Sequence, residues 1–176
     1  MFAQRYAADA SPIGPEFRVN VVEDGEQYYP SVAMLPQGGF IVSFHTSPED
    51  GRDFEVMARR FDASGEGSAE FQLNTHTASL QKLVRIAATG AGFLAVWESY
   101  GQDGDGYGVY TRCFDETIAG DAAERMASAS GERWQMAPAI AAADGRYVIA
   151  WYENTADGSF RIRSRVFTTA DCVAAP

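Results

Sequence analysis

The sequence predicts an all-β protein assembled from four-stranded repeats of the kind that form propeller blades. Three observations carry this prediction. The glutamines that open three similar segments, Gln27, Gln81 and Gln135, recur every 54 residues. Each repeat holds short strand-like runs separated by clusters of Gly, Pro, Asp and Ser. No stretch of the sequence shows sustained helical periodicity.

The four runs of a repeat differ in composition, and each fits one place in a blade. The first run (PSVAML, VRIAAT, PAIAAA) is rich in small residues, as an inner strand beside a crowded axis requires. The second (GGFIVSF, AGFLAVW, GRYVIAW) is apolar on both faces, which predicts a strand covered on both sides. The third (EVMARRFD, GVYTRCFD, RIRSRVFT) is mixed, and the fourth (EFRVN, EFQLN) alternates as a half-exposed outer strand should. A β-trefoil, with three four-stranded repeats in one chain, is the alternative.

The repeats divide the chain as a single repeat domain, residues 1–176. Residues 2–6 match the third run and residues 16–20 the fourth, so the chain enters a repeat part-way. The predicted units are a partial repeat 1–26, complete repeats 27–80 and 81–134, and a partial repeat 135–176.

Composition and charge exclude several classes of protein. The chain of 176 residues has a net charge of −10, with 24 acidic against 14 basic residues, which disfavours nucleic acid and anionic membranes as partners. It contains no run of eighteen apolar residues, so no membrane insertion is expected, and its first residues do not read as a signal peptide. The two cysteines, Cys113 and Cys172, suit either one disulfide or a pair of buried thiols.

The segments EFRVN, GEQYYPSVAMLPQGGFIVSF, VMARRFDASGE and EFQLNT together resemble a repeat found in tandem within large secreted bacterial proteins. Those repeats often stand beside hemolysin-type calcium-binding (RTX) segments and adhesin modules. The resemblance covers essentially the whole chain and implies an extracellular or cell-surface location. The chain departs from the pattern at residues 124–128, where ERMAS replaces EFQLN, and this puts the pairing of that outer strand in question.

Two incomplete repeats predict a homo-oligomer. Three blades do not close a ring, because closed propellers have about four to eight. We therefore expect two chains to join head to tail into a six-bladed ring, in which each N-terminal strand completes the last blade of the other chain. Association with a larger protein complex is the alternative.

The loops between the second and third runs contain Asp-Gly pairs, at Asp50, Asp103 and Asp157. Asp-Gly favours a hairpin turn, because glycine accepts positive φ and the aspartate hydrogen-bonds to its own turn. A second interpretation is calcium binding, with Asp103 and Asp105 as the first ligands, and Asp50 with Asp53 in the preceding loop.

Candidate catalytic residues do not form a pattern, so we expect no enzyme. Arg59, Arg112 and Arg165 recur every 53 residues, and although a sialidase uses an arginine cluster, a residue repeated by the architecture is expected to serve each repeat. Glu98 and Glu153 would have to act as an acid/base pair in a sialidase-like or glycosidase-like hydrolase, the third functional alternative. His45 and His76 belong to no catalytic or metal-binding spacing and are expected at the surface.

Aromatic residues in or beside loops are the most suggestive feature. Sugars stack on such rings at one rim of a propeller, although the same rings can fill gaps between blades. The candidates for ligand binding are Trp134, Tyr28, Tyr100, Tyr107 and Tyr152. The expected function is a non-enzymatic binding or adhesion module for carbohydrate or protein, with calcium as a structural ion. A self-assembling or accessory structural subunit is the second interpretation.

Overall fold

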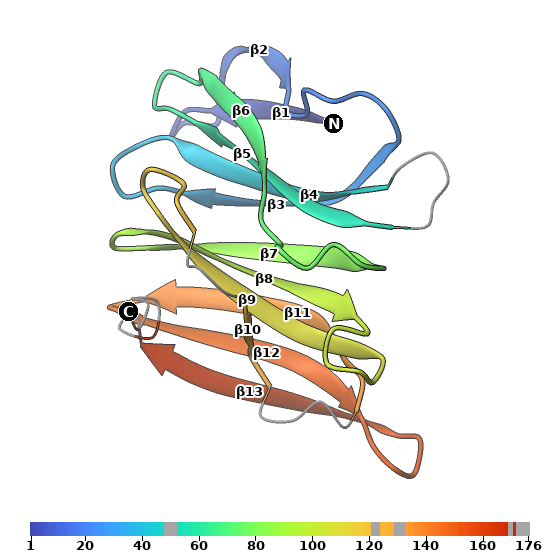
Figure 1. Cartoon of the computed structure of the whole chain (residues 1–176). Coiled ribbons are helices and arrows are strands. Elements are labelled where there is room, and N and C mark those ends of the chain that lie inside the picture. Colours follow the sequence, from blue (N-terminus) through green and yellow to red (C-terminus); the bar gives the residue numbers. More distant parts are fainter. Residues whose placement is uncertain (48–52, 121–123, 129–132, 169–170, 172–176) are drawn as a thin grey trace.

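The computed structural model describes residues 1–47, 53–120, 124–128, 133–168 and 171, and within them the chain is all-β. Its strands form four separate antiparallel sheets (Figure 1). Within each sheet, strands that are consecutive in the chain are antiparallel neighbours, so each sheet has the strand order of a meander. None of the described residues forms a helix long and apolar enough to cross a membrane.

The strands follow the predicted runs. The first sheet contains β1 (Phe2–Tyr6) and β2 (Pro12–Arg18). The second contains β3 (Glu26–Met34), β4 (Phe40–Ser47), β5 (Glu55–Phe61) and β6 (Gly67–Gln72). The third contains β7 (Gln81–Thr89), β8 (Gly92–Tyr100), β9 (Tyr107–Asp115) and the two-residue β10 (Arg125–Met126), the short outer strand that occupies the ERMAS segment. The fourth contains β11 (Gln135–Ala143), β12 (Arg146–Asn154) and β13 (Phe160–Thr168).

The sheets stack face to face in chain order, and their first strands β3, β7 and β11 lie next to one another (Figure 1). The second strand of each complete sheet is buried on both faces, as its composition predicted. On β8, Phe93 and Trp97 pack against the preceding sheet, whereas Leu94 and Val96 pack against the following one. We therefore call these two sides of a sheet its preceding face and its following face.

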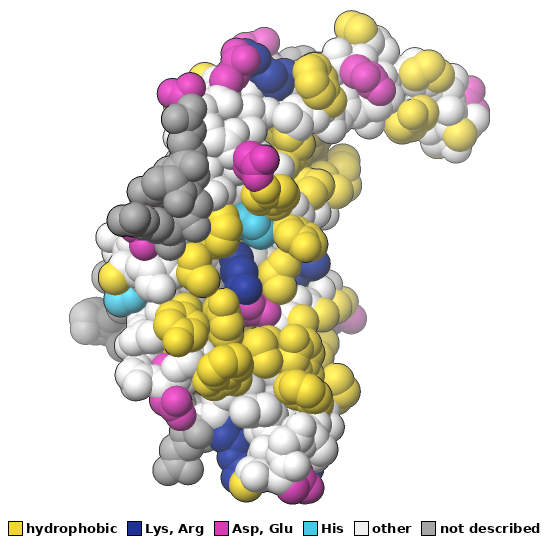
Figure 2. Space-filling model, turned by 90° about the vertical axis from the view of Figure 1, so that its right-hand side faces the viewer, with side chains coloured by type: hydrophobic (Ala, Val, Ile, Leu, Met, Phe, Trp, Pro, Cys, Tyr) yellow, Lys and Arg dark blue, Asp and Glu magenta, His cyan; other side chains and the backbone are white. Residues whose placement is uncertain are grey.

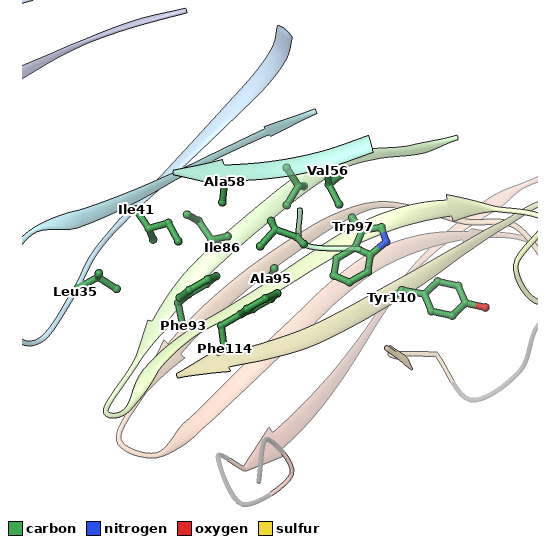
Figure 3. Packing of buried hydrophobic residues seen from close by; sticks show 12 residues of the cluster. Leu35, Ile41, Val56, Ala58, Ile86, Phe93, Ala95, Trp97, Tyr110 and Phe114 are labelled. Atoms are coloured by element: carbon green, nitrogen blue, oxygen red, sulfur yellow. The ribbon is translucent and has the colours of Figure 1, made fainter. Parts of the chain in front are cut away.

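The largest cluster of the core lies between the β3–β6 and β7–β10 sheets (Figure 3). Ile41 and Val56, both fully buried, come from the first of these sheets and meet Ile86 and Trp97 of the second. The same packing recurs at the next junction with different residues, so one architecture is used twice within the chain.

The three recurrent arginines serve the repeats structurally, as predicted. Arg59, Arg112 and Arg165 each lie over the phenylalanine two positions further on, with the guanidinium carbon 5.0, 5.1 and 4.8 Å from the ring centroid. Each Nη1 also donates a hydrogen bond to a carbonyl oxygen 38–40 residues earlier in the chain, belonging to the preceding repeat. Those acceptors are Val19, Leu73 and Ala127, at 2.9, 3.0 and 3.5 Å. The arginines therefore tie neighbouring sheets together.

Candidate functional site: an aromatic rim

A backbone bulge repeated in the first strand of three sheets builds one end of the molecule. The bulged residues Tyr29, Leu83 and Ala137 have φ of 51°, 52° and 50°, and the strand register shifts at each of them. This left-handed conformation is unfavourable for residues other than glycine, so its recurrence shows that the architecture imposes it. At two junctions, the bulge aims a backbone N–H at the preceding sheet.

The acceptors for these N–H groups are the side chains of two equivalent residues on β4 and β8. Leu83 N donates to His45 Nδ1 at 3.2 Å, and Ala137 N donates to Glu98 Oε1. His45 is buried, with 3% of its surface exposed, so the prediction of a surface histidine was wrong. Burial, assisted by the positive charges of Lys82 and Arg85, lowers the pKa of His45 to about 4 and keeps the ring neutral as an acceptor.

The second acceptor belongs to a charged pair. Lys82, the only lysine of the chain, places Nζ 3.9 Å from Glu98 Oε2 and 4.5 Å from the centroid of the Tyr107 ring. Burial raises the pKa of Glu98, while the Ala137 N–H and the cations Lys82 and Arg85 act in the opposite direction. Sequence reasoning missed Lys82; its place directly after Gln81, at the start of a repeat, was the available signal.

Around this pair, the structure brings together three of the five predicted ligand-binding residues. The ring centroids of Tyr100 and Tyr107 are 4.9 Å apart, and those of Tyr107 and Trp134 are 5.8 Å apart, both in edge-to-face geometry. Trp134 leaves 41% of its surface exposed, so it presents an open indole as well as packing against its neighbours.

The other two predicted residues, Tyr28 and Tyr152, take part in separate clusters on the neighbouring sheets. Tyr28 contacts the rings of Tyr29 and His45, at 6.4 and 5.5 Å between centroids, and Tyr152 meets Phe160 at 5.4 Å. We call the aromatic residues at these strand ends the aromatic rim: Tyr28, Tyr29, Phe54, Tyr100, Tyr107, Trp134, Tyr152 and Phe160. Figure 2 looks onto an end of the molecule where hydrophobic side chains gather around basic and acidic ones.

The loop between β8 and β9 seats the exposed tryptophan. Gly106 has φ of +68°, and a Cβ placed there would lie 1.9 Å from Trp134 Nε1, so only glycine lets the indole approach the loop. In the same loop Asp103 Oδ1 accepts a hydrogen bond from Asp105 N at 3.1 Å, as predicted for a turn aspartate.

The corresponding loop between β12 and β13 is built in the same way. Asp157 Oδ1 accepts a hydrogen bond from Ser159 N at 3.1 Å, and hydrogen bonds from the Thr155 and Ser159 side chains hold the pKa of Asp157 at about 2. The turn interpretation of the Asp-Gly pairs is therefore confirmed in these two loops. Asp50 lies outside the described residues.

The described residues contain no group of three or more His, Cys, Asp or Glu that would hold a metal ion. Asp53 is exposed to solvent. Two oxygens beside the Asp103 turn nevertheless suit a cation, because Asp103 Oδ2 and Gln102 Oε1 are buried without a hydrogen-bond partner in the described structure. The Gln102 amide donates to Glu124 Oε2 at 2.6 Å, which brings another carboxylate close.

The two glutamates of the hydrolase interpretation lie on different sheets and have separate partners. Glu98, on β8, is engaged by the Ala137 N–H and by Lys82. Glu153, on β12, lies 3.7 Å from the Arg163 guanidinium on the adjacent strand. Each carboxylate thus has a local structural role.

No protein-family model matches the chain, and no curated protein has a matching sequence. The resemblance to repeats of large secreted bacterial proteins therefore stays a prediction, and function has to be argued from the geometry of the site.

Proposed function

We propose that this chain is a non-enzymatic carbohydrate-binding module built from propeller-blade repeats, with the aromatic rim as its binding surface. The observation that carries the proposal is the exposed indole of Trp134, held by Gly106 and Tyr107 beside the Lys82–Glu98 pair. Rigid aromatic faces next to fixed polar groups are what sugar recognition requires, because sugars offer both C–H faces for stacking and hydroxyl groups for hydrogen bonding.

The arrangement of the sheets supports blades over a trefoil. Each sheet is a separate meander, and the first strands β3, β7 and β11 are adjacent, as inner strands around a propeller axis would be. In this interpretation the units follow the repeats of the sequence, and the aromatic rim surrounds one mouth of the central channel.

The net charge of the chain limits the class of carbohydrate that it would bind, and the partners of its glutamates bear on whether it would hydrolyse that ligand. A net charge of −10 disfavours acidic polysaccharides, so we infer neutral glycans as the preferred class. A binding rather than hydrolytic role is supported by the structural partners of Glu98 and Glu153 described above.

An extracellular location is supported by Cys113, which is disulfide-bonded, because disulfides persist in oxidising compartments. Calcium would act as a structural ion beside Asp103, with the two unpartnered oxygens there among its ligands. A rise in melting temperature with millimolar calcium, reversed by chelator, is the expected result, since a ligand of the native state stabilises by mass action.

A glycan array followed by calorimetric titration of the best neutral oligosaccharide tests the proposal. Trp134→Ala should weaken binding at least about tenfold, because a central aromatic contact dominates such sites. The matched control is Tyr6→Ala, which removes an aromatic ring that is 63% exposed on a strand outside the rim. An array without any bound glycan, or equal affinity of wild type and Trp134→Ala, would refute the proposal.

A further inference from the structure

Equivalent residues on the following faces of three sheets differ sharply in exposure. Val56 and Val109, at the start of the third strand of their sheets, are fully buried by the next sheet. Ile162 occupies the same place on β13, as the pairing of β4 with β5 and of β12 with β13 shows, and it is 78% exposed. Within the described residues, nothing covers this side of the last sheet, where Val166 is also 67% exposed.

The complementary preceding face is uncovered on the β3–β6 sheet. Ile86 on β7 is 6% exposed, whereas its equivalent on β3, Val32, is 64% exposed. Val32 lines an apolar cavity of about 670 Å³ between β3–β4 and the β1–β2 hairpin. Pro30, Met34 and Phe40 also line it. A hollow beneath the top of the molecule is visible in Figure 2.

The β1–β2 hairpin occupies the position of a sheet in front of the β3–β6 sheet, but it supplies only the two outer strands of that sheet. Ala3 pairs with Phe17 in the way that Ala58 pairs with Phe71, which makes β1 the equivalent of the third strand β5 and β2 the equivalent of the fourth strand β6. The last sheet, β11–β13, has the equivalents of strands one to three. Strands β1 and β13 therefore correspond to the same position in a sheet.

We propose that a second copy of this chain covers these faces, with β13 of one copy taking the place of β1 beside β2 of the other. The last sheet then has four strands, and its following face closes the cavity over Val32. This interface concerns assembly rather than the ligand of the aromatic rim, with only Phe160 of the rim on the docking strand, so it goes beyond carbohydrate binding. Because one chain offers both the exposed following face and the exposed preceding face, two identical joints join two copies into a closed ring of six sheets.

Two hydrogen bonds of Met1, the residue directly before β1, can be replaced one for one. In the isolated chain, Met1 N donates a hydrogen bond to Asn20 Oδ1 at 2.7 Å, and Val19 N donates one to the Met1 carbonyl oxygen at 3.1 Å. In the next sheet Val56 makes the equivalent two bonds, with Asn74 Oδ1 and Leu73 N. Ile162, the equivalent of Val56, is therefore placed to take over both bonds from Met1.

Strand β13 is the better occupant of the shared position. It is held by β12 over nine residue pairs, whereas β1 belongs to a two-stranded sheet and pairs only with β2 among the described strands. The exchange sets Arg165 opposite Glu16, as Arg59 stands opposite Glu70 in the β3–β6 sheet.

One pairing in this register is less favourable. Arg163 comes opposite Arg18, since their equivalents Met57 and Gln72 are paired. Each of these arginines already has a carboxylate partner in the isolated chain, Glu153 and Glu23 respectively. Each positive charge is therefore compensated by its own carboxylate. The repulsion between Arg163 and Arg18 costs no more than that between two exposed charges screened by solvent.

Light scattering after size exclusion tests the joint directly. At about 100 µM we expect a mass of twice 19.1 kDa. Ile162→Asp should give the monomer, and Ile162→Val should keep the dimer, because the site becomes apolar and buried. The matched control is Ala91→Asp, which places the same charge at an exposed residue in the turn between β7 and β8, away from both faces. A monomeric wild type, or a dimer that survives Ile162→Asp, would overturn the proposal.

Cross-linking tests the exchange of strands. Glu16→Cys combined with Arg165→Cys should give a disulfide-linked dimer on oxidation, because directly paired residues of adjacent strands lie within disulfide range. Glu16→Cys combined with Arg161→Cys is the control, since Arg161 lies four residues along the same strand and should not cross-link. A dimer in which only the control pair cross-links, or neither does, would contradict the proposed register.

Discussion

The junction between the β3–β6 and β7–β10 sheets and the junction between the β7–β10 and β11–β13 sheets present the same backbone donor to two different side chains. At the first junction the Leu83 N–H meets the neutral ring of His45, and at the second the Ala137 N–H meets the carboxylate of Glu98. Both acceptors are almost completely buried, at 3% and 2% exposure. The repeated bulge therefore requires a hydrogen-bond acceptor at both junctions. The identity of the acceptor side chain determines how the stability of each junction depends on pH.

Removal of the acceptor should have the largest effect. His45→Leu leaves the half-buried Leu83 N–H without its His45 partner and removes ring contacts with Tyr28, Tyr29 and Phe54. We expect the free energy of unfolding at pH 8 to fall by about 3 kcal/mol, the cost of an unsatisfied half-buried donor together with lost ring packing. Urea denaturation measures this loss, with His76→Leu as the control. A loss no greater than that of the control would show that water satisfies Leu83.

Acidification should have the second largest effect, a loss of stability at the junction between the β3–β6 and β7–β10 sheets. The pKa of His45 is lowered to about 4 in the folded chain from an ordinary value of 6.5. The stabilisation is therefore complete above pH 6.5 and is lost as the pH falls from 6.5 towards 4, by about 2 kcal/mol over that range. His45→Gln keeps an acceptor oxygen but does not titrate, so the difference in unfolding free energy between variant and wild type should change over this pH window. A constant difference from pH 7 to pH 4 would contradict this.

The sequence was sufficient to predict the strands, but it did not predict the bulges and hydrogen bonds at these junctions. The 54-residue recurrence and the two-sided apolar composition of β4 and β8 identified the strands correctly, because burial acts on the side chains themselves. The bulge has no sequence signature, since Tyr29, Leu83 and Ala137 share no side-chain property and it is backbone geometry that recurs. His45 was assigned to the surface for this reason.

The aromatic cluster was predicted in part. Tyr100, Tyr107 and Trp134 were found from their positions in loops, but the role of Gly106 was not predicted. The close approach of the Trp134 indole to the loop is a tertiary contact between segments about 28 residues apart, which local turn chemistry does not encode. Lys82 was missed because its partners, Glu98 and Tyr107, come from other strands.

The second junction should respond to pH in the opposite direction and by less. Burial raises the pKa of Glu98, so its charged form costs stability at neutral pH and protonation relieves that cost as the pH falls. Glu98→Gln keeps an acceptor for the Ala137 N–H and loses only the pairing with Lys82. We expect its unfolding free energy at pH 8 to lie within about 1 kcal/mol of wild type. Glu98→Leu, which removes the acceptor, should cost more, and equal losses in both variants would argue against the hydrogen bond as the important contact.

Substitution of Lys82, which lies close to the acceptors of both junctions, should have the smallest effect on stability. Its charge is the second cause of the lowered pKa of His45, and the same ammonium lies beside Glu98 and over the Tyr107 ring. Lys82→Met keeps the length of the side chain and removes the charge, so the pKa of His45 should move back towards 6.5 and that of Glu98 should rise further. The NMR titration of His45 measures the first shift, and overall stability at pH 8 should change by less than about 1 kcal/mol. A pKa of His45 that is identical in the variant and the wild type would leave burial and Arg85 as its causes and would show that Lys82 does not couple the two junctions.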